Sequence, residues 1–175
     1  AAVISAGAIT AEIRHLTINN TGGSNAASYG VYTNGVTDGS FSMLHVTATA
    51  TGSTNSYGVF NSSSSPTMNN VTATATGGSN LNYGVFNLDS SSPTMTNVTA
   101  TATGGIFSYG VYNSSSSSPS IRNSSITGDT KSIVNDGTSS VKVADTALGG
   151  EADGGVKLCV GAYTTGFVAL DANCG

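Results

Sequence analysis

Three features of the sequence predict an all-β fold in which the chain winds through stacked coils. The string Val-Thr-Ala-Thr-Ala-Thr-Gly occurs three times, beginning at Val46, Val71 and Val98. A Tyr-Gly-Val-aromatic string recurs every 26 to 28 residues, at Tyr29, Tyr57, Tyr83 and Tyr109. Clusters of Ser, Gly, Asn and Pro separate these β-rich strings, and helix formers are lacking. Strands joined by turns at a period of this length indicate one repeat per coil, which is a β-solenoid.

A second landmark keeps step with the tyrosine string. It is an apolar residue that opens a shorter string, at Ile13, Met43, Met68, Met95 and Ile121. The motif Met95-Thr96-Asn97-Val98-Thr99, with its counterpart from Ile121 to Gly128, resembles the right-handed parallel β-helix family of bacterial surface and phage proteins. The resemblance covers about residues 11–150 and implies five to six coils, each with an inward apolar residue followed by a turn residue. That turn position holds His15, His45, Asn70, Asn97, Asn123 and Asp145.

Both ends of the chain depart from the repeat. Residues 1–10 are interpreted as an incomplete first coil or a cap, and the start at Ala1 suggests a processed form. Residues 151–175 follow Gly149-Gly150 and are interpreted as a C-terminal cap, because the last coil otherwise exposes unpaired backbone groups. Within this cap, residues 157–163 and 167–170 are expected to form a β-hairpin.

The two cysteines, Cys159 and Cys174, both lie in the expected cap. If they form a disulfide, they bridge 15 residues and indicate an oxidising, extracellular compartment. A pair of free thiols is the alternative.

The threonines of the repeated string are expected to face solvent. Period-two alternation puts either the Thr or the Val and Ala side chains inside, and an unpaired buried hydroxyl costs roughly 1–3 kcal/mol. The small inward alanines imply that the opposite wall of the coil comes close. Nine outward threonines then form a flat grid with spacings of about 4.8 Å and 6.6 Å. They are Thr47, Thr49, Thr51, Thr72, Thr74, Thr76, Thr99, Thr101 and Thr103.

The tyrosine string yields two aromatic columns. With the valine of each string inward, strict alternation turns the first column inward, at Tyr29, Tyr57, Tyr83 and Tyr109. It turns the second column outward, at Tyr32, Phe60, Phe86 and Tyr112. An exposed aromatic row could stack sugar rings. A packed internal stack and an interface to another chain remain alternatives.

The turn residues are expected to be structural, because in the β-helix family stacked amides hydrogen-bond along the axis. His15 and His45 share this position and could bind a metal if they were neighbours. We expect them to be hydrogen-bonded in the polar column instead, with no metal and no cofactor.

Charge excludes some classes of partner. The net charge of −4 and the pI of about 4.7 leave no basic patch for nucleic acid, and they disfavour an anionic membrane. No apolar run approaches the ~20 residues that span a bilayer. Several charged residues crowd the C-terminal coils and are interpreted as solvated turn residues: Arg122, Asp129, Lys131, Asp136, Lys142 and Asp145.

The usual groups of glycan-active enzymes are missing from the repeat. Between Arg14 and Arg122 there is no Lys or Arg, which excludes the usual lyase base from the regular coils. A hydrolase needs paired carboxylates. The candidates Asp38 and Asp89 lie two coils apart, roughly 10 Å by the coil rise, among serine-filled loops. We therefore expect no enzyme.

Three function classes follow, in order of preference. The first is a non-catalytic extracellular or virion module that binds another copy, other surface proteins or a glycan. The second is ice binding, because the Thr-Ala-Thr-Ala-Thr rows resemble the threonine arrays of β-solenoid antifreeze proteins. The third is a polysaccharide hydrolase.

Overall fold

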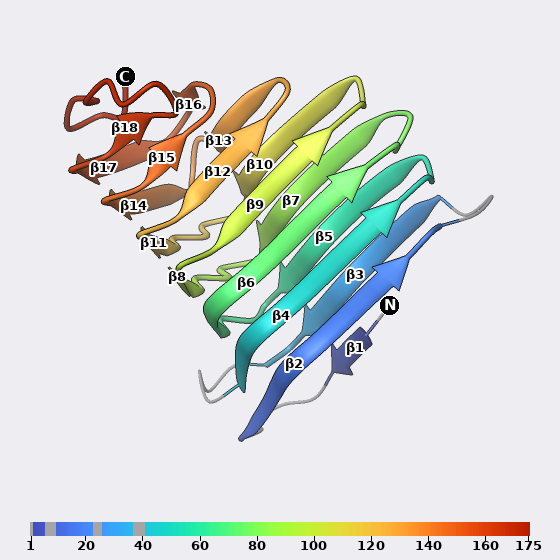
Figure 1. Ribbon diagram of the computed structural model, residues 1–175. Coiled ribbons are helices and arrows are strands. Elements are labelled where there is room, and N and C mark those ends of the chain that lie inside the picture. Colours follow the sequence, from blue (N-terminus) through green and yellow to red (C-terminus); the bar gives the residue numbers. More distant parts are fainter. Residues whose placement is uncertain (1, 6–9, 23–25, 37–40) are drawn as a thin grey trace.

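A computed structural model describes residues 2–5, 10–22, 26–36 and 41–175 of the chain. Within these ranges it contains strands and turns but no helix. Two parallel sheets face each other and form a β-solenoid of about five turns, with the N-terminal and C-terminal ends at opposite ends of the stack (Figure 1). The predicted fold class is confirmed. No helix in the described ranges is long and apolar enough to cross a bilayer.

Each coil contributes one strand to a seven-stranded sheet and one or two strands to an eleven-stranded sheet. The first, the tyrosine sheet, contains β1 (Ala2–Ser5), β3 (Ala27–Asn34), β5 (Asn55–Ser62), β7 (Leu81–Leu88), β10 (Phe107–Asn113), β13 (Lys131–Asn135) and β16 (Ala152–Asp153). The second, the threonine sheet, contains β2 (Ala11–Asn20), β4 (Phe41–Thr51), β6 (Thr67–Thr76), β8 (Thr94–Thr96), β9 (Thr99–Thr103), β11 (Ser120–Arg122), β12 (Ser125–Gly128), β14 (Ser140–Ala144), β15 (Ala147–Leu148), β17 (Val156–Val160) and β18 (Tyr163–Thr164).

The sequence repeat sets the register between coils. Met43 pairs with Met68, which pairs with Met95. On the other sheet Tyr57 pairs with Tyr83, which pairs with Tyr109. Identical residues therefore lie directly above one another, and each column of the structure is one position of the repeat.

The core between the sheets is thin where glycine faces alanine. Ala100 is fully buried, and a Cβ atom added to Gly84 would lie 3.1 Å from its carbonyl carbon and 2.9 Å from the Thr101 nitrogen. The two sheets thus approach within backbone contact, as the small inward residues predict. Larger side chains fill the wider part of the coil, in a buried column of Met43, Met68, Met95 and Ile121.

The predicted turn column bends the threonine sheet by its backbone rather than by its side chains. All six residues of this column adopt a left-handed conformation with φ between 47° and 54°, and their side chains are exposed: His15, His45, Asn70, Asn97, Asn123 and Asp145. The expectation that amides in this column bond along the axis is wrong, since no side-chain hydrogen bond joins any two of these six described residues. Asn tolerates this conformation better than most residues, which explains its recurrence.

An asparagine ladder does exist, but it lies inside the core at the end of the tyrosine-sheet strands. The Thr33 hydroxyl donates to the Asn61 side-chain oxygen over 2.8 Å, and the Asn61 amide donates to Asn87 over 2.9 Å. Asn87 continues to Asn113 over 2.8 Å, and Asn113 to Asn135 over 2.7 Å. Each buried amide is satisfied by the coils above and below it.

The C-terminal segment first continues the solenoid and then folds over its end. β17 pairs in parallel with β14, and β18 with β15. The expected hairpin of two paired strands is not confirmed: its return segment makes only an isolated antiparallel bridge, between Tyr163 and Ala169.

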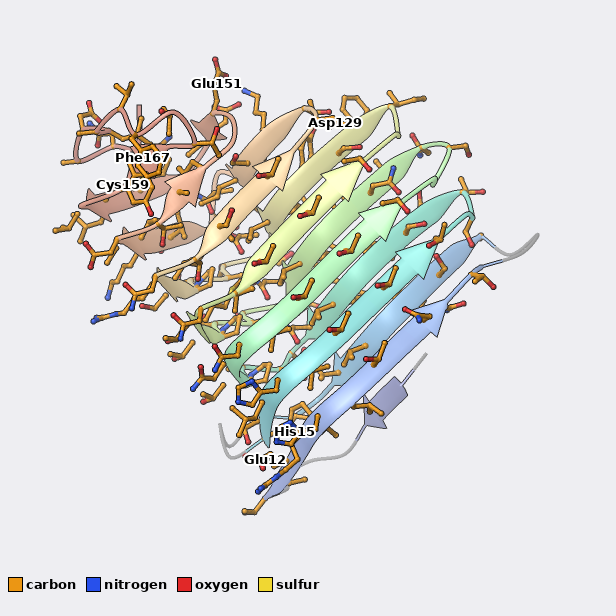
Figure 2. The ribbon with its side chains drawn as sticks, in the orientation of Figure 1. Glu12, His15, Asp129, Glu151, Cys159 and Phe167 are labelled. Atoms are coloured by element: carbon orange, nitrogen blue, oxygen red, sulfur yellow. A yellow bond between two sulfur atoms is a disulfide. The ribbon has the colours of Figure 1, made fainter. Side chains whose placement is uncertain are left out.

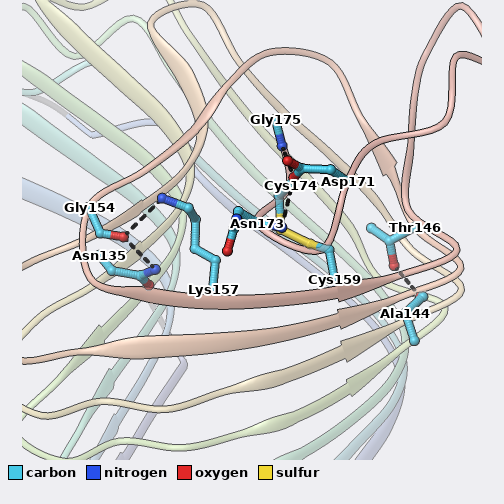
Figure 3. The surroundings of a disulfide bond; sticks show 10 residues. All are labelled: Asn135, Ala144, Thr146, Gly154, Lys157, Cys159, Asp171, Asn173, Cys174 and Gly175. Atoms are coloured by element: carbon cyan, nitrogen blue, oxygen red, sulfur yellow. Dashed lines mark hydrogen bonds between the residues drawn. A yellow bond between two sulfur atoms is a disulfide. The ribbon is translucent and has the colours of Figure 1, made fainter.

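The Cys159–Cys174 disulfide ties the tail to β17 (Figure 3). The Cys159 amide also donates to the Ala172 carbonyl over 2.9 Å. The disulfide interpretation of the cysteines is therefore confirmed.

Candidate binding surfaces

The threonine surface consists of the nine threonines of β4, β6 and β9 named above, and they face outward as expected. Thr49 pairs with Thr74, which pairs with Thr101, and the flanking threonine columns pair in the same way. The alanines between them are fully buried, whereas the threonines are at least partly exposed. In Figure 2 short side chains stand in regular rows along these strands. The result is a flat lattice of hydroxyl and methyl groups.

The hydroxyls of this lattice have no partner within the described part of the protein. None of the nine makes a hydrogen bond to another side chain or to the backbone there. Each is therefore available to solvent or to a ligand. β-Branched side chains have few χ1 rotamers, so the lattice is also stiff.

The lattice narrows in the coils on either side. Thr17 pairs with Thr47 and Thr127 with Thr101, but Asn19 stands opposite Thr49 and Ser125 opposite Thr99. Three complete rows therefore define the threonine surface.

The prediction that the first tyrosine column faces inward is wrong. The ring centroids of Tyr57 and Phe60 lie 5.3 Å apart, and those of Tyr83 and Phe86 lie 5.2 Å apart, so both columns occupy the same outer face. The physical reason is a break in alternation: Gly84 abuts the opposite sheet, and the next residue, Val85, is also fully buried. The outward orientation of the second column is confirmed. Together the two columns form the aromatic ladder: Tyr29, Tyr32, Tyr57, Phe60, Tyr83, Phe86, Tyr109 and Tyr112.

The rings of the aromatic ladder cover one another. Phe60 and Phe86 stack with centroids 4.8 Å apart and an interplanar angle of 10°, and Tyr29 and Tyr57 stack at 5.0 Å and 13°. Ring faces therefore meet ring faces, and a sugar has few free faces on which to stack. Burial, with the neighbouring Tyr29 as a second cause, raises the pKa of Tyr57 to about 12. These features describe a packed structural stack.

The histidines and carboxylates singled out in the sequence do not assemble into one site. His15 and His45 stack with ring centroids 5.0 Å apart. The described residues contain no group of three or more His, Cys, Asp or Glu placed to hold a metal ion. Asp89 is an exposed turn residue with φ of 56°, and Asp38 lies outside the described residues.

Three charged residues interpreted as turn residues lie on strands instead: Arg122, Lys131 and Lys142. Arg122 ends β11 and Lys142 lies in the middle of β14, both exposed on the outer face of the threonine sheet. Alternation in Ser120-Ile121-Arg122 and in Val141-Lys142-Val143 is the sequence signal that places them there. Lys131, by contrast, forms ion pairs with Asp153 at 2.6 Å and with Glu151 at 3.4 Å.

Comparisons of the chain with protein-family models, curated protein sequences and solved structures found no match.

Proposed function

We propose that this chain is a non-catalytic binding module whose threonine surface attaches to an ordered glycan. The observation that carries the proposal is the register of nine outward threonines with no hydrogen-bond partner in the described part of the chain. Each threonine hydroxyl can donate one hydrogen bond to a sugar hydroxyl and accept another from it. Each methyl group can pack against an apolar sugar face. Because the lattice is stiff, little conformational entropy is lost on binding.

Regular repetition favours an ordered ligand over a single small molecule. Neighbouring hydroxyls repeat at about 4.8 Å across the coils and about 6.6 Å along each strand. A polymer with its own regular spacing engages many such groups at once, and weak contacts then add into useful avidity.

A secreted or surface-displayed setting, on a bacterium or a virion, belongs to the same proposal. The Cys159–Cys174 disulfide supports it, because disulfides persist in oxidising compartments. The low content of charged residues also suits a module that works by its faces.

The test is co-sedimentation of the whole chain with insoluble cellulose, chitin and peptidoglycan. Thr74→Tyr places a bulky ring at the centre of the lattice and is expected to reduce retention on the bound polymer at least tenfold. Thr94→Tyr is the matched control, since Thr94 is exposed on β8, on the other side of the Asn97 turn. Equal retention of Thr74→Tyr and the unmodified chain contradicts the proposal. The proposal is also contradicted if the chain is retained by none of the three polymers. In that case, concentration-dependent self-association detected by light scattering would identify another copy of the chain as the ligand.

Ice is a second candidate ligand, favoured by the combination of free hydroxyls and methyl groups on a flat lattice. Such a surface holds ordered water at spacings set by the sheet. Ice recrystallisation and thermal hysteresis assays are expected to be positive and to be abolished by Thr74→Tyr but not by Thr94→Tyr. No activity at high protein concentration eliminates this candidate.

A further inference from the structure

Two of the five cationic side chains make no ion pair with any described residue, and they lie near each other on one face. The chain contains five Lys and Arg residues. Arg14 pairs with Glu12, Lys131 pairs with two carboxylates, and the Lys157 ammonium donates to the Gly154 carbonyl. Arg122 and Lys142 form no ion pair or side-chain hydrogen bond within the described ranges.

Arg122 and Lys142 lie on adjacent strands at diagonal positions. Arg122 pairs with Ala144, which is two residues beyond Lys142 on β14. Strand spacing places the two Cα atoms ~8 Å apart, so one carboxylate can reach both side chains. Without an anion, the two positive charges repel each other.

An apolar strip borders the two cations. β17 lies next to β14 at the edge of the threonine sheet, and three of its side chains face outward: Val156, Leu158 and Val160, with exposed fractions of 70%, 51% and 66%. In the preceding coils, the positions in register with Leu158 are polar: Ser42, Thr67, Thr94, Ser120 and Lys142. Three consecutive outward aliphatic residues are therefore an exception that calls for a partner.

The cations and the strip line the same hollow. Its volume is about 160 Å³, and it lies across β11, β14 and β17, with Ser120, Arg122, Lys142, Ala144, Leu158 and Val160 on its wall. Lys142 pairs with Leu158, and Ala144 with Val160, so each cation shares a row with one aliphatic residue of β17.

We propose that this hollow docks an extended segment of a partner protein that presents a carboxylate between apolar side chains. In an extended segment, alternate side chains repeat at about 6.6 Å, which matches the spacing of the rows on the sheet. Its carboxylate lies between Arg122 and Lys142 as a charge-assisted pair, and its neighbouring apolar side chains cover Leu158 and Val160.

Charge and side-chain chemistry favour a protein segment over a glycan or a lipid surface. Leu158 and Val160 offer no aromatic face to a sugar, and Ser120 supplies the only uncharged hydrogen-bonding side chain of the wall. Membrane attachment usually needs four to eight basic residues, whereas this face offers two on a chain of net charge −4.

The experiment titrates the isotopically labelled whole chain with a nine-residue peptide and follows the amide NMR signals. The peptide carries valine, glutamate and valine at its third, fifth and seventh positions and serine elsewhere, so that these three side chains share one face when the peptide is extended. We expect saturable shifts confined to the amides of β11, β14 and β17, and binding that weakens as salt rises. The same peptide with lysine in place of glutamate is expected to give no shifts. The double substitution Arg122→Gln with Lys142→Gln is expected to weaken binding at least tenfold, and so is Leu158→Thr with Val160→Thr.

Arg14→Gln and Thr74→Tyr are the controls, because both residues lie outside the hollow, and both variants are expected to bind normally. The result on Thr74→Tyr also separates this proposal from the glycan proposal, which depends on that residue. A variant that loses its native amide spectrum is replaced by the single substitution Lys142→Gln. The proposal is overturned if both peptides bind equally, if neither gives saturable shifts, or if only alginate oligosaccharides or phosphatidylglycerol vesicles perturb these strands.

Discussion

Asn61 donates a hydrogen bond from its side-chain amide to the side-chain oxygen of Asn87 over 2.9 Å, and both side chains are fully buried. Asn87 in turn donates to Asn113. Such a chain stabilises only the register in which every coil contributes its asparagine at the same level. A shift of one residue would leave buried amides unpaired, so the ladder fixes the stacking of the coils.

Asn87→Leu is expected to be strongly destabilising. The substitution keeps the branched shape of the side chain but leaves the Asn61 donor and the Asn113 acceptor without partners, and each buried unpaired group costs roughly 1–3 kcal/mol. Urea unfolding followed by circular dichroism measures the loss. Asn34→Leu is the control, because Asn34 is exposed, and it is expected to change stability by less than about 0.5 kcal/mol. Equal urea midpoints for the two variants would show that the asparagine ladder does not contribute to stability.

Gly84→Ala tests the close approach of the two sheets. The new methyl group would lie 2.6 Å from the Gly110 carbonyl oxygen and 2.9 Å from the Thr101 nitrogen, and both are backbone atoms that have little room to move. Overpacking of this kind costs about 1–3 kcal/mol, so a lower melting temperature is expected. Gly137→Ala is the matched control, since nothing lies within 4 Å of its added Cβ. If Gly84→Ala and Gly137→Ala have the same melting temperature, the two sheets do not approach each other closely at Gly84.

The coil architecture could be predicted from the sequence because each repeat position recurs at nearly constant spacing. Val46, Val71 and Val98 share one string, so the outward threonines followed from strand alternation and from the cost of burying hydroxyls. The tyrosine orientation could not be derived from alternation alone, because Gly84 and Val85 both face inward. A glycine opposite the alanine column was the available signal.

The asparagine ladder could not be predicted from the sequence for a different reason. Asn87 lies two residues beyond the inward Val85, so alternation places it in the core, but a lone amide is costly to bury. Only the pairing of whole coils shows that Asn61 and Asn113 satisfy it. The hollow beside Arg122 could not be predicted, because its wall comes from three coils. The C-terminal sequence is irregular and does not indicate how these coils align.

Asp136 makes stability depend on pH in the acidic range. Burial alone would raise the pKa of this carboxyl group, but hydrogen bonds from the Ser115 amide, the Ser139 and Thr138 hydroxyls and the Thr138 amide outweigh it and lower the pKa. The folded pKa therefore lies below the unfolded value of about 3.9. The stabilisation is complete above that value and is lost as the pH falls through the range below it.

Asp136→Asn is expected to be less stable than the unmodified chain at pH 7, and the difference is expected to shrink between pH 4 and pH 2, in about the range set by the unfolded pKa. Urea midpoints at a series of pH values measure it. Asp89→Asn is the control, because Asp89 is an exposed turn residue in the serine loop after β7, two coils before Asp136. A difference that stays constant from pH 7 to pH 2 would contradict the role of the Asp136 charge.

Loss of the Cys159–Cys174 disulfide is expected to loosen the C-terminal end before the rest of the solenoid. The bond closes a loop of 15 residues, which corresponds to about 3 kcal/mol of stabilisation. The tail also covers the edge of the last coil, through the bonds from Cys159 to Ala172 and from Leu170 to Ala162. Without the disulfide, the tail can leave that edge, and unpaired strand edges promote association between chains. Cys159→Ser with Cys174→Ser is therefore expected to lose hydrogen-exchange protection in β17 and β18, to keep it in β4 to β10, and to form larger species in light scattering. Protection lost equally along the whole chain would show instead that the stack unfolds as one unit.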